Sequence, residues 1–410
     1  MAAVKKRKTV LVIGGGAAGL MAAGTAARAG ARVVLLEKND RPGRKLLLTG
    51  KGRCNLTNSR PLAEFIENYP GNGVFLFSAL NVFGNQELMQ FFTSRGVPLK
   101  EERGGRVFPA SDRSLDILKA LVGYLRAGEV ELRLNEPATR LLVDWENRRV
   151  RGAATSRDKY VADAVIISTG GLSYPKTGST GDGYRWAREL GHTLITPRPA
   201  LVPLETAEEW RAELAGLTLK NVSVRALADG MLLGEDFGEL LFTHFGVSGP
   251  TVLTLSGFIT DYWERRTAEV TLSIDLKPAL DPEQLDRRLQ RELAKAGRRL
   301  FKNSLGELLP RALIPVFVRI SGIPGNKPAN QITREERQGI IRLLQHFQLR
   351  AVRPRPVEEA IVTAGGVAVK EIDPRTMASR RWSGLYFAGE VIDVYGYTGG
   401  YNLQAAFSTG

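Results

Sequence analysis

The chain has 410 residues, of which 43% are hydrophobic and 24% charged, which is a globular composition and excludes a disordered protein. Its length predicts two or three domains rather than one simple core. The formal net charge of +14 is compatible with a solubilising surface or with a polyanionic partner.

The sequence also argues against a membrane protein and against a metal or disulfide scaffold. No apolar run approaches the roughly 20 residues that span a bilayer. The apolar stretch after the basic residues 5–8 breaks at Gly14 without a cleavage site, so we expect no signal peptide. One cysteine excludes an intramolecular disulfide, and three scattered histidines make a zinc site implausible. We therefore expect a cytoplasmic protein without a bound metal.

Residues 9–37 predict a complete βαβ unit. A β-branched apolar run (9–14) precedes a glycine-rich turn, a helix that ends near Gly30, and a second apolar run (31–37). The turn reads G-x-G-x-x-G over Gly14, Gly16 and Gly19, whose expected roles are a tight turn, close approach to a pyrophosphate, and close helix–strand packing. Glu37 follows Gly16 by 21 residues, where an acid binds the ribose, and it disfavours a 2′-phosphate. FAD or NAD is therefore expected rather than NADP.

The loop GRKLLLTGKGRCNLTN (43–58) follows this unit and contains no acid. Cations and an amide placed after the second strand are suited to a pyrophosphate and a flavin edge. We therefore expect Arg44, Lys45 and Asn55 to contact the cofactor.

The rest of the chain predicts an interrupted domain. DAVIISTGG (163–171) is another buried strand, and the end of the chain gives a strand, Gly389-Glu390, Asp393, a glycine pair and a helix. We expect a discontinuous FAD-binding domain (1–192 with 357–410), an antiparallel sheet or barrel (193–278 with 346–356), and a helical insertion (279–345) that begins at Asp281-Pro282.

Three features favour FAD over NAD. There is only one complete dinucleotide fingerprint, Asp393 is suitably placed to bind a ribityl chain, and the helix that starts near Tyr401 can direct its amides at the flavin N1/O2 edge.

Several motifs together resemble a known family, the HI-0933-like (BaiN/RdsA) family of bacterial NAD(P)/FAD-dependent oxidoreductases. They include GGGAAGL, GRKLLLTGKGRCNLTN, STGGLSYPKTGSTGDGY, LFTHFGVSGP, TAGGV and LYFAGEVIDVYGYTGGYNLQAAFSTG. The resemblance implies an α/β fold with a Rossmann-like FAD domain of the glutathione-reductase and fumarate-reductase type, carrying an inserted β domain and a small helical domain. It also implies NAD(P)H as a transient electron donor.

From the motifs and this resemblance we expect a set of cofactor-binding residues. They are Gly14, Gly16, Ala17, Ala18, Gly19, Glu37, Lys38, Arg44, Lys45, Gly52, Arg53, Cys54, Asn55, Ala138, Thr169, Gly170, Gly389, Glu390, Asp393, Gly400, Asn402 and Leu403.

The activities reported for the family are reduction of uridine in large-subunit ribosomal RNA, reduction of conjugated C=C bonds in bile-acid intermediates, and oxidation of small amines. Reduction of a conjugated C=C bond requires a general acid beside the flavin. Cys54 is a candidate, because Arg53 and Lys51 would favour its thiolate, although a small residue packed beneath the flavin is the favoured explanation. His244 is either a proton donor or a residue that caps its turn.

The basic residues gather in two regions. Residues 1–60 hold thirteen Lys/Arg against two acids, and residues 286–302 hold seven against two. Such clusters are solvated faces or sites for RNA phosphates. The leading hypothesis is NAD(P)H-driven conversion of uridine to dihydrouridine in 23S ribosomal RNA. The alternatives are a small-molecule enone reductase, an aminoacetone-type amine oxidase, and a flavin-containing RNA-binding factor without turnover. The oligomeric state is left open.

Overall fold

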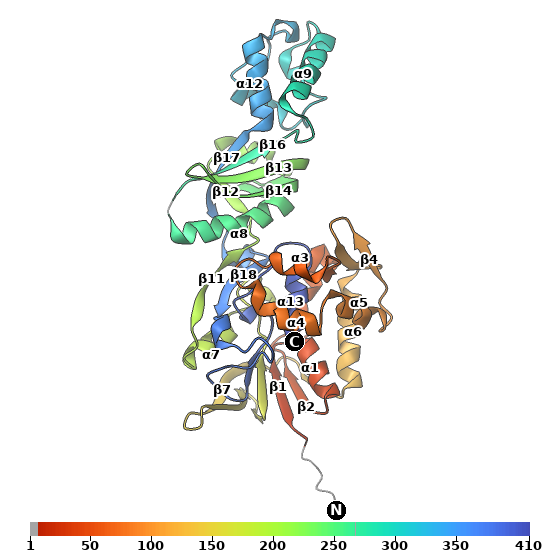
Figure 1. Ribbon diagram of the computed structural model, residues 1–410, viewed down its shortest axis with the longest axis vertical. Helices are drawn as coiled ribbons and strands as arrows, with labels where there is room; N and C mark the ends of the chain where they lie inside the picture. Colours follow the sequence, from red (N-terminus) through yellow and green to blue (C-terminus); the bar gives the residue numbers. More distant parts are fainter. Residues whose placement is uncertain (1–6, 267) are drawn as a thin grey trace, which may run out of the picture. The chain divides into compact units, whose positions relative to one another are not determined.

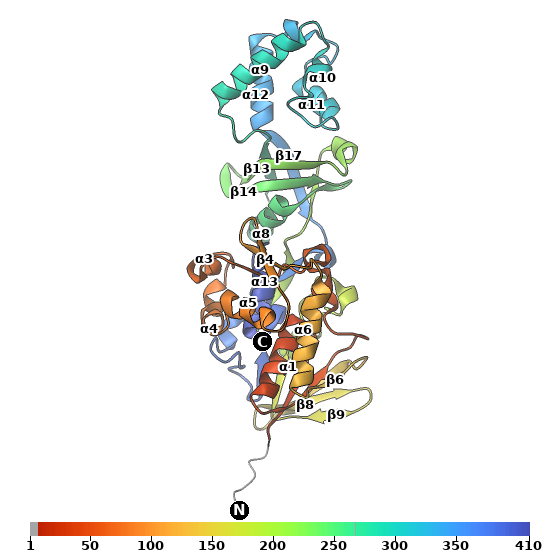
Figure 2. The same cartoon turned by 90° about the vertical axis from the view of Figure 1, so that its right-hand side faces the viewer.

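The computed structural model describes residues 7–266 and 268–410, which form two compact units. Unit 1 combines the chain up to Ala200 with Val357–Gly410, and unit 2 is the continuous segment Leu201–Pro356. Figures 1 and 2 show the elements of each unit from two directions. Among the described residues, no helix is both long and apolar enough to cross a membrane.

The centre of unit 1 is a five-stranded parallel sheet in the order β19-β10-β1-β2-β6. Its strands are β1 (Thr9–Ile13), β2 (Arg32–Leu36), β6 (Glu131–Arg133), β10 (Ala164–Ile167) and β19 (Leu385–Phe387). Alternate side chains of β1 enter different cores. Val12 packs with helices α1 (Ala17–Arg28) and α6 (Ser114–Ala127), which lie side by side in Figures 1 and 2. Leu11 and Ile13 enter the core on the opposite face.

That opposite face is covered by α7 (Asp182–Glu189) and a three-stranded antiparallel sheet of β7 (Ala138–Asp144), β8 (Arg149–Thr155) and β9 (Lys159–Val161). A second small sheet, in the order β3-β5-β4, lies among short helices. These elements are α2 (Arg44–Leu48), β3 (Thr57–Asn58), α3 (Leu62–Glu67), α4 (Phe77–Val82), α5 (Asn85–Thr93), β4 (Leu99–Glu102) and β5 (Arg106–Pro109). The last helix, α13 (Tyr401–Thr409), contacts α1.

The chain leaves and re-enters unit 1 through two paired strands. β11 (Leu194–Ala200) is antiparallel to β18 (Val362–Val367), with Ala200 opposite Val362. The sequence pattern placed residues from 193 onwards in the β domain, whereas β11 belongs to unit 1. Its alternating pattern is that of any antiparallel strand, so only its partner reveals which unit it joins.

Unit 2 contains a closed six-stranded antiparallel barrel in the order β12-β15-β14-β13-β16-β17. Its strands are β12 (Leu204–Thr206), β13 (Thr218–Ala228), β14 (Met231–Phe242), β15 (Gly246–Ser248), β16 (Val270–Asp275) and β17 (Phe347–Pro354). The sequence pattern is compatible with either an antiparallel sheet or a barrel, and the structure shows a closed barrel. The pattern did not predict the helix α8 (Pro250–Arg265), which packs on β14 and starts with proline at its first position.

The remaining part of unit 2 is helical, with α9 (Pro282–Ala296), α10 (Phe301–Ser304), α11 (Ile314–Ser321) and α12 (Arg334–Gln345). The predicted helix start at Asp281 is confirmed, because its carboxylate accepts a hydrogen bond from the Gln284 amide at 2.7 Å. Leu285, Leu289 and Leu293 form the buried face of α9 and share one core with the barrel.

Candidate dinucleotide and redox site

The carboxyl ends of β1, β10 and β19 bring three glycine-containing turns to one edge of the unit 1 sheet. In this sheet β1 lies between β2 and β10, so the chain connects to strands on both sides of β1. Nucleotides bind in such sheets at the carboxyl ends of the strands where the connections diverge. Gly14 has φ +106°, and a Cβ there would lie 2.5 Å from the Ser168 carbonyl oxygen. At Gly19 a Cβ would lie 1.9 Å from the Gly14 carbonyl oxygen. The turn is therefore restricted to glycine at both positions.

Gly16 differs from these two glycines because it faces open space. It is the N-cap of α1, and no atom lies within 4 Å of the position that its Cβ would take. The first amides of α1, at Ala17 and Ala18, have no partner within the helix and give this end a partial positive charge. The geometry therefore leaves room for an anion directly before α1.

Glu37 is buried at the end of β2 and organises the adjoining turns. One carboxylate oxygen accepts the Gly15 N–H at 2.8 Å, and the other accepts both N–H groups of Asn39, at 2.8 and 2.7 Å. The oxygen bonded to Gly15 keeps one acceptor position for a ribose hydroxyl. The neighbouring Lys38 instead forms an ion pair with Asp182 at 2.7 Å.

Arg44 and Thr169 leave buried polar atoms without a partner. The Arg44 guanidinium forms an ion pair with Asp40 at 2.8 Å, but its Nε is buried and has no hydrogen bond among the described residues. The Thr169 hydroxyl is buried and unpaired in the same way, but it lies against Gly183 of α7, and it is the Thr169 backbone that borders Gly14. Unsatisfied buried polar groups cost free energy, so the Arg44 Nε fits a bound polar ligand.

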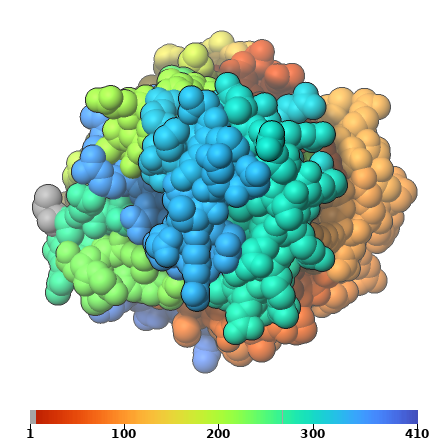
Figure 3. All heavy atoms as spheres, turned by 90° about the horizontal axis from the view of Figure 1, so that it is seen from above, coloured from red at the N-terminus to blue at the C-terminus, as the bar shows by residue number. Residues whose placement is uncertain are grey.

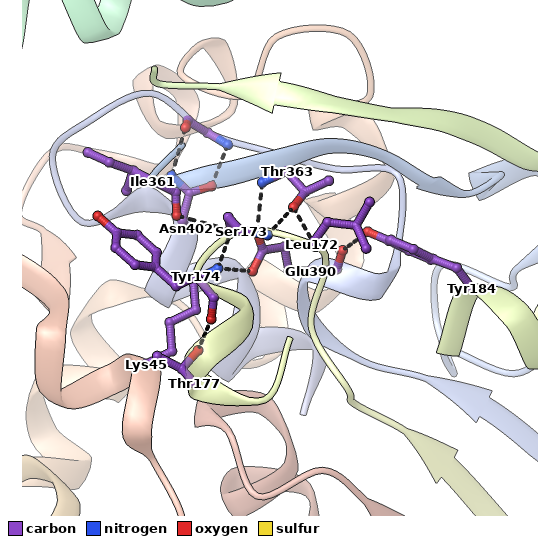
Figure 4. A network of polar contacts seen from close by, with 11 residues as sticks. Lys45, Leu172, Ser173, Tyr174, Thr177, Tyr184, Ile361, Thr363, Glu390 and Asn402 are labelled. Atoms are coloured by element: carbon purple, nitrogen blue, oxygen red, sulfur yellow. Dashed lines mark hydrogen bonds and ion pairs between the residues drawn. The ribbon is translucent and has the colours of Figure 1, made fainter. Parts of the chain in front are cut away.

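Lys45 lies in a polar network that joins four segments of unit 1 (Figure 4). Its ammonium group donates to Glu390 and to the Ser173 hydroxyl, both at 2.6 Å. The other Glu390 oxygen accepts from the Ser173 hydroxyl at 3.0 Å and from the Thr363 amide at 2.7 Å. Lys45 is therefore neutralised within the protein. The sequence did not single out Ser173 or Thr363, although both lie within the quoted motifs STGGLSYPKTGSTGDGY and TAGGV.

Arg53 is likewise engaged by acids of unit 1. It pairs with Glu102 and, at 2.7 Å, with Asp112, and its guanidinium lies 4.1 Å from the centre of the Phe108 ring. The hydrogen bonds to Asp112 and Glu102 raise the Arg53 pKa. Gly52 before it has φ +86°, which permits the sharp turn into this position.

Cys54 is fully buried in an apolar cluster with Leu46, Leu56 and Val107. Burial raises the pKa of its thiol to about 12, outweighing the opposite effect of a hydrogen bond with Thr49. The expectation that Arg53 and Lys51 favour the thiolate is therefore wrong, because the Arg53 charge is directed at carboxylates and desolvation dominates. These features support the packing interpretation of Cys54.

The start of α13 is held by the loop 43–58. In the amide orientation that satisfies both its ends, Asn55 accepts the Gly400 N–H at 3.1 Å and donates to the Thr57 carbonyl at 3.1 Å. Gly400 has φ +103°, and a Cβ there would lie 2.3 Å from the same Thr57 carbonyl oxygen. The Asn402 side chain bonds to the backbone N–H and carbonyl of Gly396 at 2.8 and 2.7 Å. Both amide side chains thus position the helix start.

The remaining expected cofactor residues are Gly170, Gly389, Asp393, Leu403 and Ala138. Gly389 has φ +75° and lies against Ala18, where a Cβ would be 2.8 Å from the alanine methyl group. Gly170 has φ +72°, Asp393 accepts a hydrogen bond from Asn72 at 2.8 Å, and Leu403 packs half-buried beside the α1 core. Ala138 opens β7 and pairs with Thr155 in the small sheet that covers the opposite face.

His244 belongs to unit 2, in the exposed turn between β14 and β15. Its ring lies edge-on to Phe245, with centroids 4.9 Å apart. Its imidazole nitrogens have no hydrogen-bond partner among the residues that the structure describes. The side chain is thus exposed to solvent and does not cap its turn, whose hydrogen bonds are made by Thr243.

The residues of unit 1 fit a bound dinucleotide. A glycine turn, an open helix N-terminus and a buried acid with one acceptor position left meet at one edge of the sheet, and the Arg44 Nε is unpaired in the loop that follows β2. Within residues 7–266 and 268–410, no three His, Cys, Asp or Glu side chains are grouped as metal ligands. This arrangement is that of a Rossmann-type dinucleotide-binding protein.

The chain belongs to the HI0933-like family, a family of FAD-dependent oxidoreductases, because the profile of the HI0933-like protein Rossmann domain matches residues 8–410. It is 35% identical over 405 residues to the 3-dehydro-bile acid delta(4,6)-reductase of Clostridium scindens, covering 97% of this chain and 96% of the relative. It is 32% identical over 412 residues to the ribosomal RNA dihydrouridine synthase of Escherichia coli, covering 98% and 96%.

Solved structures with the same fold include two flavoprotein oxidoreductases. The 3-ketosteroid-delta4-(5alpha)-dehydrogenase of Rhodococcus jostii has a TM-score of 0.50 and 15% identity over 99% of this chain and 98% of its own. The 3-ketosteroid delta1-dehydrogenase of Sterolibacterium denitrificans has a TM-score of 0.51 and 14% identity, covering 98% of both chains. These confirm the predicted fold class, a Rossmann-like flavoprotein domain with inserted modules.

Proposed function

We propose that this protein reduces uridine to dihydrouridine in 23S ribosomal RNA, with FAD bound at the edge of the unit 1 sheet and NAD(P)H as electron donor. The observation that favours RNA over a small molecule is a row of exposed cations in residues 287–302, none of which has an acidic partner within 4.0 Å among the described residues. Full-length similarity to two ribosomal RNA dihydrouridine synthases supports the same substrate.

The contacts within unit 1 indicate which residues would hold each part of FAD. The amides before α1 would bind the pyrophosphate, the free acceptor position of Glu37 would bind the ribose, and Arg44 would supply a donor that is unpaired in the protein. The start of α13 offers further amides to the ring system. FAD, once bound and reduced, would supply the hydride that a conjugated C=C bond accepts at the carbon β to its carbonyl, which in uridine is C6.

The reaction also requires a proton at the neighbouring carbon, for which the sequence offers two candidates, Cys54 in unit 1 and His244 in unit 2. The thiol has no exposed surface and its pKa is raised to about 12 by burial, so proton delivery to a substrate is unfavourable. His244 is solvent-exposed and its ring nitrogens are not engaged by described residues.

The substrate proposal is tested in an Escherichia coli strain that lacks its own ribosomal RNA dihydrouridine synthase and carries the gene for this chain. Nucleosides from purified 23S ribosomal RNA are separated by liquid chromatography with mass detection. We expect dihydrouridine to be restored; its absence, with the protein expressed and yellow, would exclude this substrate. Anaerobic bleaching of the flavin band at about 450 nm by NADH or NADPH tests the donor.

Two variants test the proton donor. His244→Gln is expected to lower the rate at which substrate reoxidises reduced protein by about 10²-fold, as the loss of a general acid does, without loss of FAD. Cys54→Ala is expected to retain that rate. The opposite pattern would return the catalytic role to Cys54.

A second candidate function is reduction of a conjugated small-molecule enone, favoured by the 35% identity to the bile acid reductase. NAD(P)H consumption with a 3-oxo-4,6-diene steroid, in the absence of RNA, is the discriminating measurement. Turnover with that substrate in a protein that leaves 23S ribosomal RNA unmodified would establish this alternative.

A further inference from the structure

The helical part of unit 2 carries an unneutralised row of cations, which we call the α9 cationic stripe. It consists of Arg287, Arg291, Lys295, Arg298, Arg299 and Lys302, and all six side chains are exposed. Within the described part of the chain, none of the six lies within 4.0 Å of an acidic group. Figure 3 shows this segment, in teal, at the surface of the helical region.

The stripe occupies one side of its helix. Arg287, Arg291 and Lys295 are spaced by four residues, so they lie above one another on one face and span about 12 Å along the axis. The buried positions Leu285, Leu289 and Leu293 are offset from them by two residues, or about 200° around the helix. The three helical cations therefore point away from the core, and Arg298, Arg299 and Lys302 follow them in the sequence after α9 ends at Ala296.

The stripe has no evident role in holding the helices together. That role is filled by other charged pairs, Asp286 with Arg337 at 2.7 Å between α9 and α12, and Lys327 with Glu336 at 2.6 Å. Like charges four residues apart destabilise a helix by a few tenths of a kcal/mol per pair. The stripe is therefore available to a partner outside the protein.

We propose that the α9 cationic stripe binds the phosphate backbone of the RNA substrate; this inference rests on the proposed function. Exposed Arg and Lys side chains without internal partners neutralise phosphates and release counterions, which gives affinity without sequence readout. The stripe thus anchors the RNA, while selection of the target uridine belongs to the redox site. Affinity for RNA must then depend steeply on salt.

The test compares two variants of the full-length, FAD-loaded protein that lose the same net charge. In the first, R287Q/R291Q/K295Q, the helical face of the stripe is neutralised. The matched control, R140Q/R157Q/K159Q, neutralises three exposed cations on the β7-β8-β9 sheet that also lack acidic partners within 4.0 Å among the described residues. Binding to protein-free 23S ribosomal RNA is measured by filter retention or anisotropy across a salt series.

The stripe variant is expected to reduce the slope of log K against log[salt] by about 2 to 3, with a weaker Kd at every salt concentration, and the control to keep the wild-type slope. Unchanged binding of the stripe variant overturns the inference. An equal loss in both variants also overturns it, because the effect is then one of total charge. Stripe-dependent binding to polyglutamate without stripe-dependent binding to RNA overturns it in favour of an acidic protein partner.

Failure of this inference is distinguishable from failure of the proposed function. Restored dihydrouridine in the complemented strain, together with wild-type RNA affinity of the stripe variant, leaves the enzyme activity standing and removes the stripe from it. Absence of dihydrouridine, together with stripe-dependent RNA affinity, would exclude the proposed activity and leave the stripe as an RNA-binding surface.

Discussion

The cations of residues 7–60 and those of residues 287–302 come from similarly basic stretches of sequence but have different surroundings. In the first region, six side chains lie within 4.0 Å of an acid: Arg32, Lys38, Arg44, Lys45, Arg53 and Arg60. Lys5 and Lys6 lie outside the described residues. In the second region, none of the six cations of the stripe has such a partner among the residues described.

The comparison of these two regions shows that a local excess of positive charge does not by itself indicate a polyanionic partner. Among the acids that pair with the first region, Asp40 and Glu64 lie four residues from their partners, whereas others are remote in sequence, as when Glu390 pairs with Lys45 across 345 positions. A charge count over a window of sequence misses such partners. Six of the eleven Lys and Arg side chains of residues 7–60 are thus engaged by acids, whereas those of the α9 cationic stripe remain available.

The largest expected effect is loss of FAD from a variant in which no charge is changed. Gly16→Val places a side chain in open space at a backbone conformation that valine tolerates, so the protein should fold. The side chain fills the space before α1, and we expect FAD retention to fall by at least about 100-fold, because the pyrophosphate approaches the backbone here. The ratio of flavin to protein absorbance measures this. Gly123→Val, also without a neighbour within 4 Å, is the control. A yellow Gly16→Val protein would falsify the assigned site.

The second effect tests the internal pairing of Lys45. Lys45→Met leaves the largely buried Glu390 without its cation and should lower the free energy of unfolding by about 2 kcal/mol, measured with urea. The double variant Lys45→Met/Glu390→Gln should recover part of this loss, because no unpaired charge remains. Equal stability of wild type and Lys45→Met would contradict the pairing.

The third prediction concerns stability at low pH, because an ion pair is lost when its carboxylate becomes protonated. Burial raises the pKa of Glu371, but hydrogen bonds from Arg381, Thr193 and His192 outweigh it and lower the pKa to about 2. Since the unfolded carboxyl titrates near 4.5, this contribution to stability is complete above pH 4.5 and is lost as pH falls towards 2. Urea unfolding at several pH values should show this decline, and Glu371→Gln should flatten it. An unchanged profile in that variant would assign the decline to other groups.

The smallest effects distinguish paired from unpaired cations directly. Arg53→Gln removes bonds to Glu102 and Asp112 and the contact with Phe108, and should lower the free energy of unfolding by about 1 kcal/mol. Neutralising three cations of the stripe should change it by less than about 0.5 kcal/mol. Comparable losses in the two variants would mean that the stripe is also structural.

The first βαβ unit was predictable because its signals are local. The glycine turn, the helix length and the acid at Glu37 lie within 30 residues of one another, and each has a direct physical reason. The start of α9 was predictable for the same reason, since Asp281 and Gln284 are three residues apart.

The features that could not be predicted depend on residues far apart in the sequence. The assignment of β11 to unit 1 is determined by β18, about 165 residues later, and the inert state of Cys54 by apolar residues such as Val107. The Ser173–Glu390 bond likewise joins segments that no local pattern relates. The helix α8 was hidden between strand-like segments, although Gly249-Pro250 is a recognisable start signal.

The interruption of unit 1 has a consequence for biosynthesis. On the ribosome, all of unit 2 is translated before Val357–Gly410, the segment that supplies β18, β19, Glu390 and α13. Domains generally fold as units while the chain is being made, so unit 2 can mature while Lys45 still lacks its carboxylate partner. The flavin site that begins at Thr9 is therefore completed last, and a nascent chain can bind flavin only after Val357–Gly410 has been translated.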